Sequence, residues 1–406
     1  LAQNGVDAVL FGGRGGDWCR DAGVETCALP CLGRFSARAR GWSRRLPGFT
    51  WRWGLKTQYG WEQLTFWLRM WRKLRSGSFD ILHVQDPMLA FWCRRFRRAG
   101  LVRTREILAH GTEEPPEWLA PFEFVQHLAP WHLDTVLDAL RKRGDDAARP
   151  GWTAIPNFVD TTTFKPAADG AGKQACRQRL GIPEDAFVIG TAATVKRSHK
   201  RIDHLIGEFS AFARAAGVSR GAGRPYLLAA GSRAPDSDAL VQSAHALCGD
   251  RAAILLDVPR RQMPDLYRCM DAFVLTSLFE MMPIAVLESL ACGLPVISHD
   301  TPVLRWMPGA GGGGAAMIGD RSSMISNEET VNGEPSAVGG GASSPEGGAV
   351  VDMGRDGALA SFLSGLDARW VRERGRAARK RATRMFSREE VVKRYIAYYE
   401  EVLRTR

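Results

Sequence analysis

One segment, Ser277 to Asp300, constrains the fold of this chain more than any other. It continues a short apolar run rich in β-branched residues, Asp271 to Ser277, of the kind that forms a buried parallel strand. After Pro283 the residues predict a helix closed by Gly293, because proline suits a first helical turn and glycine often follows a helix end. A second apolar run, 295–300, comes next. The segment therefore predicts a strand, loop, helix and strand of an α/β sheet.

Two glutamates lie eight positions apart across the predicted strand-to-helix junction. Glu280 falls in the loop at the carboxyl end of the strand, and Glu288 falls about one and a half turns inside the helix. The unpaired N–H groups and positive dipole end of a helix start bind phosphate. Carboxylates before and inside the helix can accept hydrogen bonds from hydroxyls. A polyhydroxylated diphosphate, such as a sugar nucleotide, fits this pattern.

The rest of the chain alternates short apolar strands with helical stretches, which is typical of doubly wound α/β domains. The predicted strands of the first half are 7–13, 81–86, 105–111 and 153–157. Those of the second half are 186–194, 225–231, 252–258, 271–277 and 295–300. Two Rossmann-like halves follow, with a boundary near Asn157 to Pro166. Ligands of open α/β sheets bind beyond the carboxyl ends of the strands, so we expect a site between the halves.

Length and composition fit two globular domains, with 406 residues of which 45% are hydrophobic. No apolar run reaches the roughly 18 residues of a membrane span, and the first residues lack a secretion signal. The eight cysteines are scattered, without a CxxC pair or a Cys/His cluster at metal-ligand spacing. We interpret them as reduced residues of a cytoplasmic protein. Cys27 and Cys31 have the alternative interpretation of half a metal site.

The formal net charge of +11 is concentrated in residues 35–75, where Glu62 is the single acid and tryptophans interleave with arginines and lysines. One interpretation is a peripheral contact with an anionic membrane surface or an acidic acceptor. The other is packing on a sheet, since apolar residues recur at helical spacing at Trp61, Leu64, Leu68 and Trp71. We expect no nucleic-acid partner, because no recognised binding motif accompanies the charge.

Several segments together carry a family resemblance. Glu280 and Glu288 match an E-x7-E motif, preceded in the expected order by residues 155–166 and the basic segment 196–209, and followed by residues 386–403. The chain thereby resembles the retaining glycosyltransferases of family 4, known as glycosyl transferases group 1. The resemblance implies a GT-B fold, in which two Rossmann-like doubly wound domains face a cleft. It also implies transfer of a sugar from a nucleotide diphosphate sugar to an acceptor hydroxyl with retention of configuration.

The resemblance also implies a domain plan. Residues 1–158 would form the acceptor-side domain, 159–385 the donor domain, and 386–406 a terminal helix crossing back to the first domain. The glycine- and serine-rich stretch of about 309–348 is predicted to be a mobile insertion. The opening residues resemble the second strand of such a domain, so the first domain is predicted to lack its opening strand, which suggests a fragment.

The basic segment supplies candidate cations for the donor diphosphate, whose charge grows as the glycosidic bond breaks. Lys200 matches the family lysine that binds the diphosphate oxygens, with Lys196 or Arg197 nearby. Val195 departs from the family, since many members place an arginine there. A solvated cationic loop is the alternative interpretation.

By the same resemblance, Glu280 contacts sugar hydroxyls and Glu288 contacts ribose hydroxyls. The other donor-binding residues lie in the loop and at the helix start, where Met281 replaces a common glycine: Met281, Met282, Pro283 and Ile284. The predicted catalytic residues are Glu280, Lys200 and His110.

His110 ends a predicted strand of the first half and matches a histidine that in the family reaches the donor sugar. A packed polar residue is the alternative interpretation. His83 and Asp86 resemble another strand-end pattern, but we expect them to shape the fold or the acceptor pocket.

No metal or cofactor is required by this scheme, in which the nucleotide sugar is the donor substrate. The acceptor stays open among glycans, lipids and small molecules, with polysaccharide or glycoconjugate synthesis as the expected setting. A competing hypothesis is a degenerate or truncated transferase that binds sugar nucleotides without transfer. A nicotinamide-dependent enzyme is disfavoured, because residues 12–17, GGRGGD, have the wrong glycine spacing.

Overall fold

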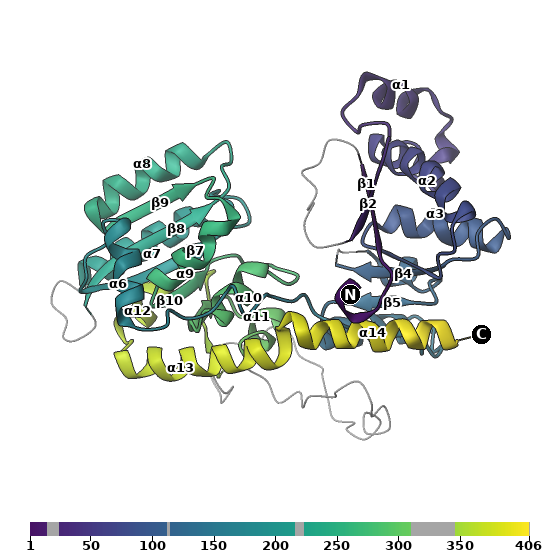
Figure 1. The fold of residues 1–406 in the computed structure, drawn as a ribbon. Helices are drawn as coiled ribbons and strands as arrows, with labels where there is room; N and C mark the ends of the chain where they lie inside the picture. Colours follow the sequence, from purple (N-terminus) through teal and green to yellow (C-terminus); the bar gives the residue numbers. More distant parts are fainter. Residues whose placement is uncertain (14–23, 112–113, 216–222, 310–345, 406) are drawn as a thin grey trace. The chain divides into compact units, whose positions relative to one another are not determined.

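The computed structural model describes residues 1–13, 24–111, 114–215, 223–309 and 346–405 (Figure 1). They form two compact units, Leu1–Asn157 with Glu389–Arg406, and Phe158–Arg388. The final helix thus packs with the first unit. Most of the predicted glycine- and serine-rich insertion lies outside the described residues.

The first unit has two separate parallel sheets, with strand orders β1-β2 and β3-β4-β5-β6. The strands are β1 (Val9–Gly13), β2 (Glu25–Leu29), β3 (Ile81–Val84), β4 (Arg105–His110), β5 (Val125–His127) and β6 (Trp152–Ala154). The four strands predicted for this half are confirmed, with shifted ends. The unpredicted strands are β5, which is too short to show a period, and β2, whose sequence ETCAL lacks a clear apolar run.

Helices cover both faces of the larger sheet. They are α1 (Ala37–Arg45), α2 (Gln58–Ser76), α3 (Pro87–Arg98), α4 (Pro116–Leu119), α5 (Pro130–Arg141) and α14 (Arg388–Arg404), with 3-10 turns η1 (Ala2–Asn4) and η2 (Gly48–Trp53). Helices α2, α3 and α5 share one core with Leu108 and Val125 of the sheet. On the opposite face, α14 packs Val391 and Val402 against Ile107.

Three polar contacts hold these layers in place. The Tyr398 hydroxyl of α14 donates a hydrogen bond to the Gly151 carbonyl at 2.7 Å. Asp86 caps α3 by accepting from Met88 N at 2.9 Å. His83 Nδ1 lies 2.7 Å from the Tyr399 hydroxyl. His83 and Asp86 therefore shape the fold, as predicted.

The buried stripe of α2 differs from the predicted one. The residues of α2 that are buried are Gly60, Phe66, Trp67, Met70 and Leu74, whereas Trp61, Leu64, Leu68 and Trp71 are only partly buried. Helical spacing fits both sets of residues. The set that faces the core is the one that contains the fully buried Trp67. Among the described residues of the first unit, the exposed aromatic side chains lie in and around α1 and η2: Phe35, Trp42, Phe49, Trp51 and Trp53.

The second unit contains one parallel sheet in the order β12-β11-β10-β7-β8-β9. Its strands are β7 (Ala186–Ala192), β8 (Arg224–Gly231), β9 (Ala252–Leu256), β10 (Ala272–Leu275), β11 (Val296–Ser298) and β12 (Gly348–Val350). The five predicted strands are confirmed, and β12 is additional. After β7 the chain adds β8 and β9 on one side of that strand, and it then adds β10, β11 and β12 on the other side. The topological switch point therefore lies between β7 and β10.

Helices cover both faces of this sheet as well (Figure 1). They are α6 (Gly170–Arg179), α7 (Ile202–Ala215), α8 (Ser237–Cys248), α9 (Met263–Cys269), α10 (Ile284–Ala291), α11 (Pro302–Trp306), α12 (Ala358–Ser364) and α13 (Ala368–Arg381), with 3-10 turns η4 (Gly249–Arg251) and η5 (Arg260–Gln262) and a π-helical turn η7 (Ala382–Phe386). Helices α7, α8 and α12 share one core, which includes Phe209 and Val274. Across the described parts of both units, no helix is long and apolar enough to span a membrane.

Candidate functional site

The candidate site of the second unit lies at the switch point, beyond the carboxyl ends of β7 and β10. Lys200, in the loop after β7, donates a hydrogen bond from Nζ to Oε1 of Glu280, in the loop after β10. His199 Nε2 lies 3.5 Å from the same oxygen. The Glu280 side chain is only 10% exposed. Two residues predicted separately from different segments thus form one ion pair.

Backbone geometry ties the Lys200 loop to its neighbour. His199 and Arg201 adopt positive φ angles of 66° and 50°, a region that side chains rarely occupy. The Arg201 N–H donates to the Arg197 carbonyl at 2.9 Å, and the Thr276 hydroxyl donates to the Lys200 carbonyl at 2.8 Å. The loop is thereby folded back on itself and pinned to the end of β10, which positions the lysine beside Glu280.

The remaining basic residues of the loop lie differently. Val195, where the family resemblance leads one to look for arginine, is fully buried in the core that includes α7. Lys196 is partly exposed and Arg197 is exposed. Arg197 lines a pocket of about 560 Å³ together with Arg201, His204, Glu208 and other residues, and that pocket does not include Lys200 or Glu280. Lys200 therefore pairs with Glu280, whereas Arg197 lines a separate pocket.

Glu288 is buried on α10 and has two side-chain partners. The Tyr267 hydroxyl donates to Oε2 at 2.8 Å, and Arg260 Nη2 donates to Oε1 at 3.2 Å. Burial raises the pKa of Glu288, while these two partners act to lower it. Burial and the neighbouring Glu288 carboxylate raise the pKa of Tyr267 well above its usual range. Tyr267 thus remains a protonated donor, and the exposed Arg260 gives the carboxylate a cationic partner from the solvent side.

The start of α10 lies between the two glutamates in the chain. Pro283 occupies the N-cap position and makes no side-chain capping bond. Met281 and Pro283 are partly buried, Met282 is buried, and Ile284 is exposed. Exposed Leu278 and Phe279 precede Glu280. Because the first turn has no side-chain cap, its N–H groups offer donors to an anion.

His110, the predicted catalytic residue of the first unit, is 2% exposed at the end of β4. Its Nδ1 lies 3.2 Å from Nδ1 of His127, and its Nε2 lies 3.4 Å from a Glu114 carboxylate oxygen. His132 stacks on its ring at a centroid distance of 4.7 Å. The structure places His110 in a cluster of histidines that sequence reasoning missed. His127 and His132 are separated by four residues, a spacing within the H-x₃₋₅-H range of zinc ligands, and this was the local signal that sequence reasoning passed over.

Sequence reasoning also missed Tyr267 and Arg260 as partners of Glu288. Both lie more than a helix away from Glu288 in sequence, in α9 and η5. The short basic stretch that contains Arg260 lies between β9 and α9, and its sequence gives no sign that Arg260 pairs with Glu288. The contact arises only because α9 and α10 pack on the same face of the sheet.

Comparison with known proteins places a family match on this unit. Residues 172–317 match the model of the glycosyl transferases group 1 family. A relative named D-inositol 3-phosphate glycosyltransferase, from Xylanimonas cellulosilytica, is 30% identical over 178 residues, which are 41% of this chain and 39% of the relative. The chain thus spans about two-fifths of the curated relative's length.

Solved structures extend the similarity to the whole fold. Sucrose-phosphate synthase from Thermosynechococcus elongatus superposes with a TM-score of 0.68 at 16% identity, covering 99% of this chain and 90% of that one. HepE of Anabaena, solved with UDP and glucose, gives a TM-score of 0.60 at 12% identity, covering 93% and 86%. The chain has the α/β GT-B fold with Rossmann-like parallel sheets, as predicted.

Proposed function

We propose that the chain is a glycosyltransferase that moves a sugar from a nucleotide diphosphate sugar to an acceptor hydroxyl, with retention of configuration. The observation that carries the proposal is the meeting of Lys200 and Glu280 at the switch point between β7 and β10. Open α/β sheets bind their ligands at such a point. The family match over residues 172–317, the relative named as a glycosyltransferase and the neighbouring fold of HepE, solved with UDP and glucose, support the same assignment.

Different residues bind the diphosphate, the sugar and the ribose of the donor. The uncapped start of α10 and the Lys200 ammonium offer donors and positive charge to the diphosphate. Glu280 accepts from sugar hydroxyls once the donor displaces its lysine partner. Glu288 accepts from ribose hydroxyls, and Tyr267 holds its carboxylate in place. The loop residues Met281 and Met282 close over the sugar.

In the proposed reaction, the bond between the anomeric carbon and the diphosphate oxygen breaks while the acceptor oxygen attacks from the same face. The acceptor proton moves to a phosphate oxygen of the departing diphosphate, so no protein nucleophile is needed. Positive charge grows on the anomeric carbon and negative charge on the leaving group. Lys200 and the helix start stabilise the leaving group. The role of His110 in this reaction stays a prediction from the resemblance.

The exposed aromatic surface of the first unit, formed by Phe35, Trp42, Phe49, Trp51 and Trp53 among basic residues, supports a second part of the proposal. Trp42 and Phe49 accompany Arg44, Arg45 and Arg52, which lie in α1 and η2. Exposed tryptophan beside arginine suits the interface of an anionic membrane. We place the acceptor there, as a lipid-linked or surface glycan, rather than among small soluble molecules.

The test titrates the full chain with UDP-, GDP- and ADP-sugars while following thermal stability and release of nucleoside diphosphate. A ligand at about one hundred times its Kd stabilises the folded state by about 2.7 kcal/mol. We expect this shift with one donor and its loss in Glu288→Gln. The matched control is Glu373→Gln on the exposed part of α13, which should keep the shift. No response to any donor would overturn the proposed function.

One observation favours a second candidate, a degenerate transferase that binds nucleotide sugars without transfer. The family match lies entirely within the second unit. A thermal shift with one donor, lost in Glu288→Gln but without sugar transfer or donor hydrolysis, would support this binding protein. Turnover with any acceptor would exclude it.

A further inference from the structure

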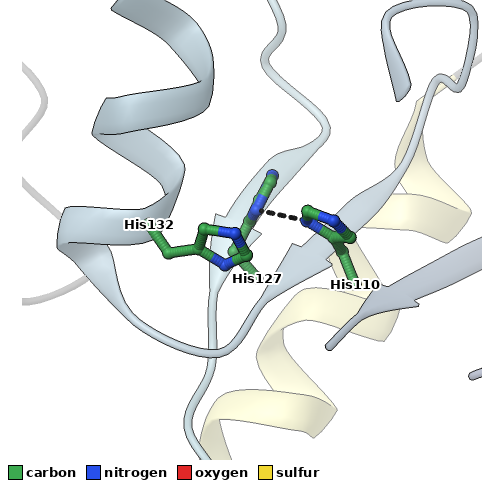
Figure 2. Close-up of side chains that lie close together, drawn as sticks. All are labelled: His110, His127 and His132. Carbon is green, nitrogen blue, oxygen red and sulfur yellow. Dashed lines mark hydrogen bonds between the residues drawn. The ribbon is translucent and has the colours of Figure 1, made fainter. Parts of the chain in front are cut away.

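Three histidines of the first unit converge from three elements (Figure 2). His110 ends β4, His127 ends β5, and His132 lies in the first turn of α5. The carboxyl ends of β4 and β5 are neighbours because Leu108, Ala109 and His110 pair in parallel with residues 125–127. The turn after β5 then carries α5 back over the same edge. Parallel pairing and a short turn therefore bring the three rings together.

The spacing of their nitrogens suits one metal ion. One ring nitrogen from each histidine lies within 4.8 Å of the other two. The Nδ1 atoms of His110 and His127 are 3.2 Å apart. Two imidazole nitrogens on a tetrahedral zinc ion lie about 3.3 Å apart, since each Zn–N bond is about 2.0–2.1 Å long. The closest pair thus already has the separation of two ligands, and His132 on α5 offers the third nitrogen.

Two of the rings are buried and that of His132 is half-buried, and several of their nitrogens lack a hydrogen-bond partner in the described part of the chain. His127 is fully buried, and His110 is 2% exposed. Among the residues that the structure describes, His127 Nε2 and His132 Nδ1 are buried without a hydrogen-bond partner. Buried polar atoms without partners are costly, so the cluster is open to a ligand that would bind its nitrogens.

We propose that His110, His127 and His132 bind one divalent transition-metal ion of the Zn²⁺ type. Imidazole suits zinc, and three histidines leave a fourth position for water or another ligand. Glu114 strengthens the assignment, because its carboxylate oxygen lies 3.4 Å from His110 Nε2. With Nδ1 on the metal, Nε2–H of His110 points to a carboxylate, as in the carboxylate–histidine–zinc arrangement. The proposal does not rest on sugar transfer.

A second group of potential ligands, His204, Glu208 and Asp356, is the natural rival. Its Glu208 carboxylate already accepts from the N–H groups of Gly357 at 2.6 Å and Ala360 at 2.9 Å, where α12 begins. Binding a cation there would compete with this helix-capping role. Asp356 is almost fully exposed, at 97% for its side chain. The histidine cluster is therefore the better site.

The assignment changes the role expected of His110. With one nitrogen on a metal and the other facing Glu114, the ring has no free nitrogen for a donor sugar. His110 then organises the edge of the first unit instead of contacting the reacting centre. Metal binding and sugar contact by His110 are mutually exclusive, and the experiment below separates them without measuring sugar transfer.

The experiment uses the full chain, stripped with a chelator and dialysed into metal-free buffer. Zn²⁺ affinity is measured by competition with a chromophoric chelator, and Co²⁺ serves as a spectroscopic probe of nitrogen coordination. We expect about one equivalent of Zn²⁺ with nitrogen-ligand absorption from Co²⁺. The decisive variant is His132→Ala, because this half-buried residue is the ligand whose loss least disturbs the core. It should weaken Zn²⁺ binding at least tenfold.

Matched variants locate the ion. His204→Ala disables the rival group and should leave the affinity unchanged. Glu114→Gln should weaken binding about 10- to 100-fold, the usual cost of losing a carboxylate behind a ligating histidine. Circular dichroism checks folding, and His132→Asn repeats the test with a polar side chain. An absence of Zn²⁺ binding, binding that persists in both His132 variants, or binding lost in His204→Ala would each overturn the proposal.

Discussion

The glutamate site of the second unit and the histidine cluster of the first occupy equivalent places, at the carboxyl ends of parallel strands, yet their chemistry differs. Glu280 and Glu288 are charged side chains paired with Lys200 and Arg260. The histidines are uncharged partners of one another, two of them buried and one half-buried, and some of their ring nitrogens have no hydrogen-bond partner among the described residues. A site whose charges are paired is ready to exchange those partners for a ligand. In the histidine site two Nδ1 atoms face each other at 3.2 Å, and a cation between them can accept a lone pair from each ring.

Buried titratable groups in the two units, outside the histidine cluster, predict opposite responses of stability to pH. Burial lowers the pKa of His83 in the first unit and raises the pKa of Glu288 in the second. A buried base with a lowered pKa makes the free energy of unfolding decrease as pH falls. A buried acid with a raised pKa makes the free energy of unfolding decrease as pH rises.

The largest expected effect is on catalysis by the second unit. Lys200→Ala removes the cation that would stabilise the departing diphosphate, so turnover should fall by about 10²–10³-fold. Initial rates with the responding donor measure it. Lys393→Ala, which removes an exposed lysine paired with Glu390 on α14, is the control. Equal turnover in both variants would mean that the Lys200–Glu280 pair is only structural.

A second effect concerns acid stability of the first unit. The pKa of His83 is lowered from 6.5 to about 4, because burial outweighs its hydrogen bond with Gln126, while Tyr395 and Tyr399 pack against its ring. The contribution of the buried His83 to the free energy of unfolding is fully present above pH 6.5 and is lost as pH falls through 4. The total loss is on the order of 3 kcal/mol. Urea unfolding between these pH values measures it. His83→Gln should flatten this pH dependence, and an unchanged slope would contradict the assignment.

Loss of the Tyr267 hydroxyl should have a smaller effect, confined to the second unit. Tyr267→Phe removes the donor to Glu288 at 2.8 Å and leaves a buried carboxylate with one partner fewer. The free energy of unfolding should fall by about 1–3 kcal/mol, and the pKa of Glu288 should rise further. A double-mutant cycle with Glu288→Gln measures the coupling. Strictly additive effects would show that the bond contributes nothing.

The smallest effect on stability is expected at the exposed aromatic surface of the first unit. Trp51 and Phe49 are 67% and 61% exposed, so Phe49→Ala with Trp51→Ala should change the free energy of unfolding by no more than about 0.5 kcal/mol for each substitution. Sedimentation with anionic phosphatidylserine vesicles should nevertheless reveal weaker binding. Leu247→Ala, at an exposed apolar position on α8, is the control. Equal vesicle binding in all variants would contradict the proposal that this aromatic surface contacts a membrane.

The two sites also differ in how far the sequence predicted them. The strand, loop and helix around Glu280 and Glu288 were predictable, because period, proline and glycine are local signals within one segment. The partners Tyr267 and Arg260 were not, since their contacts depend on how α9 and α10 pack. In α2 the fully buried residues are not the four at the predicted helical spacing, of which Trp71 packs at the margin of the core, because helical spacing alone does not fix which side meets the sheet.

The sequence by itself determined the two-part α/β organisation, most of the strands, and the residues of the loop and helix at the glutamate site. Their signals lie within short stretches of chain, where hydrophobic period and turn residues act locally. Only the tertiary structure decided that Lys200 pairs with Glu280 and that His110, His127 and His132 share one site. Those contacts arise from parallel strand pairing, which aligns the carboxyl ends of strands that are distant in sequence.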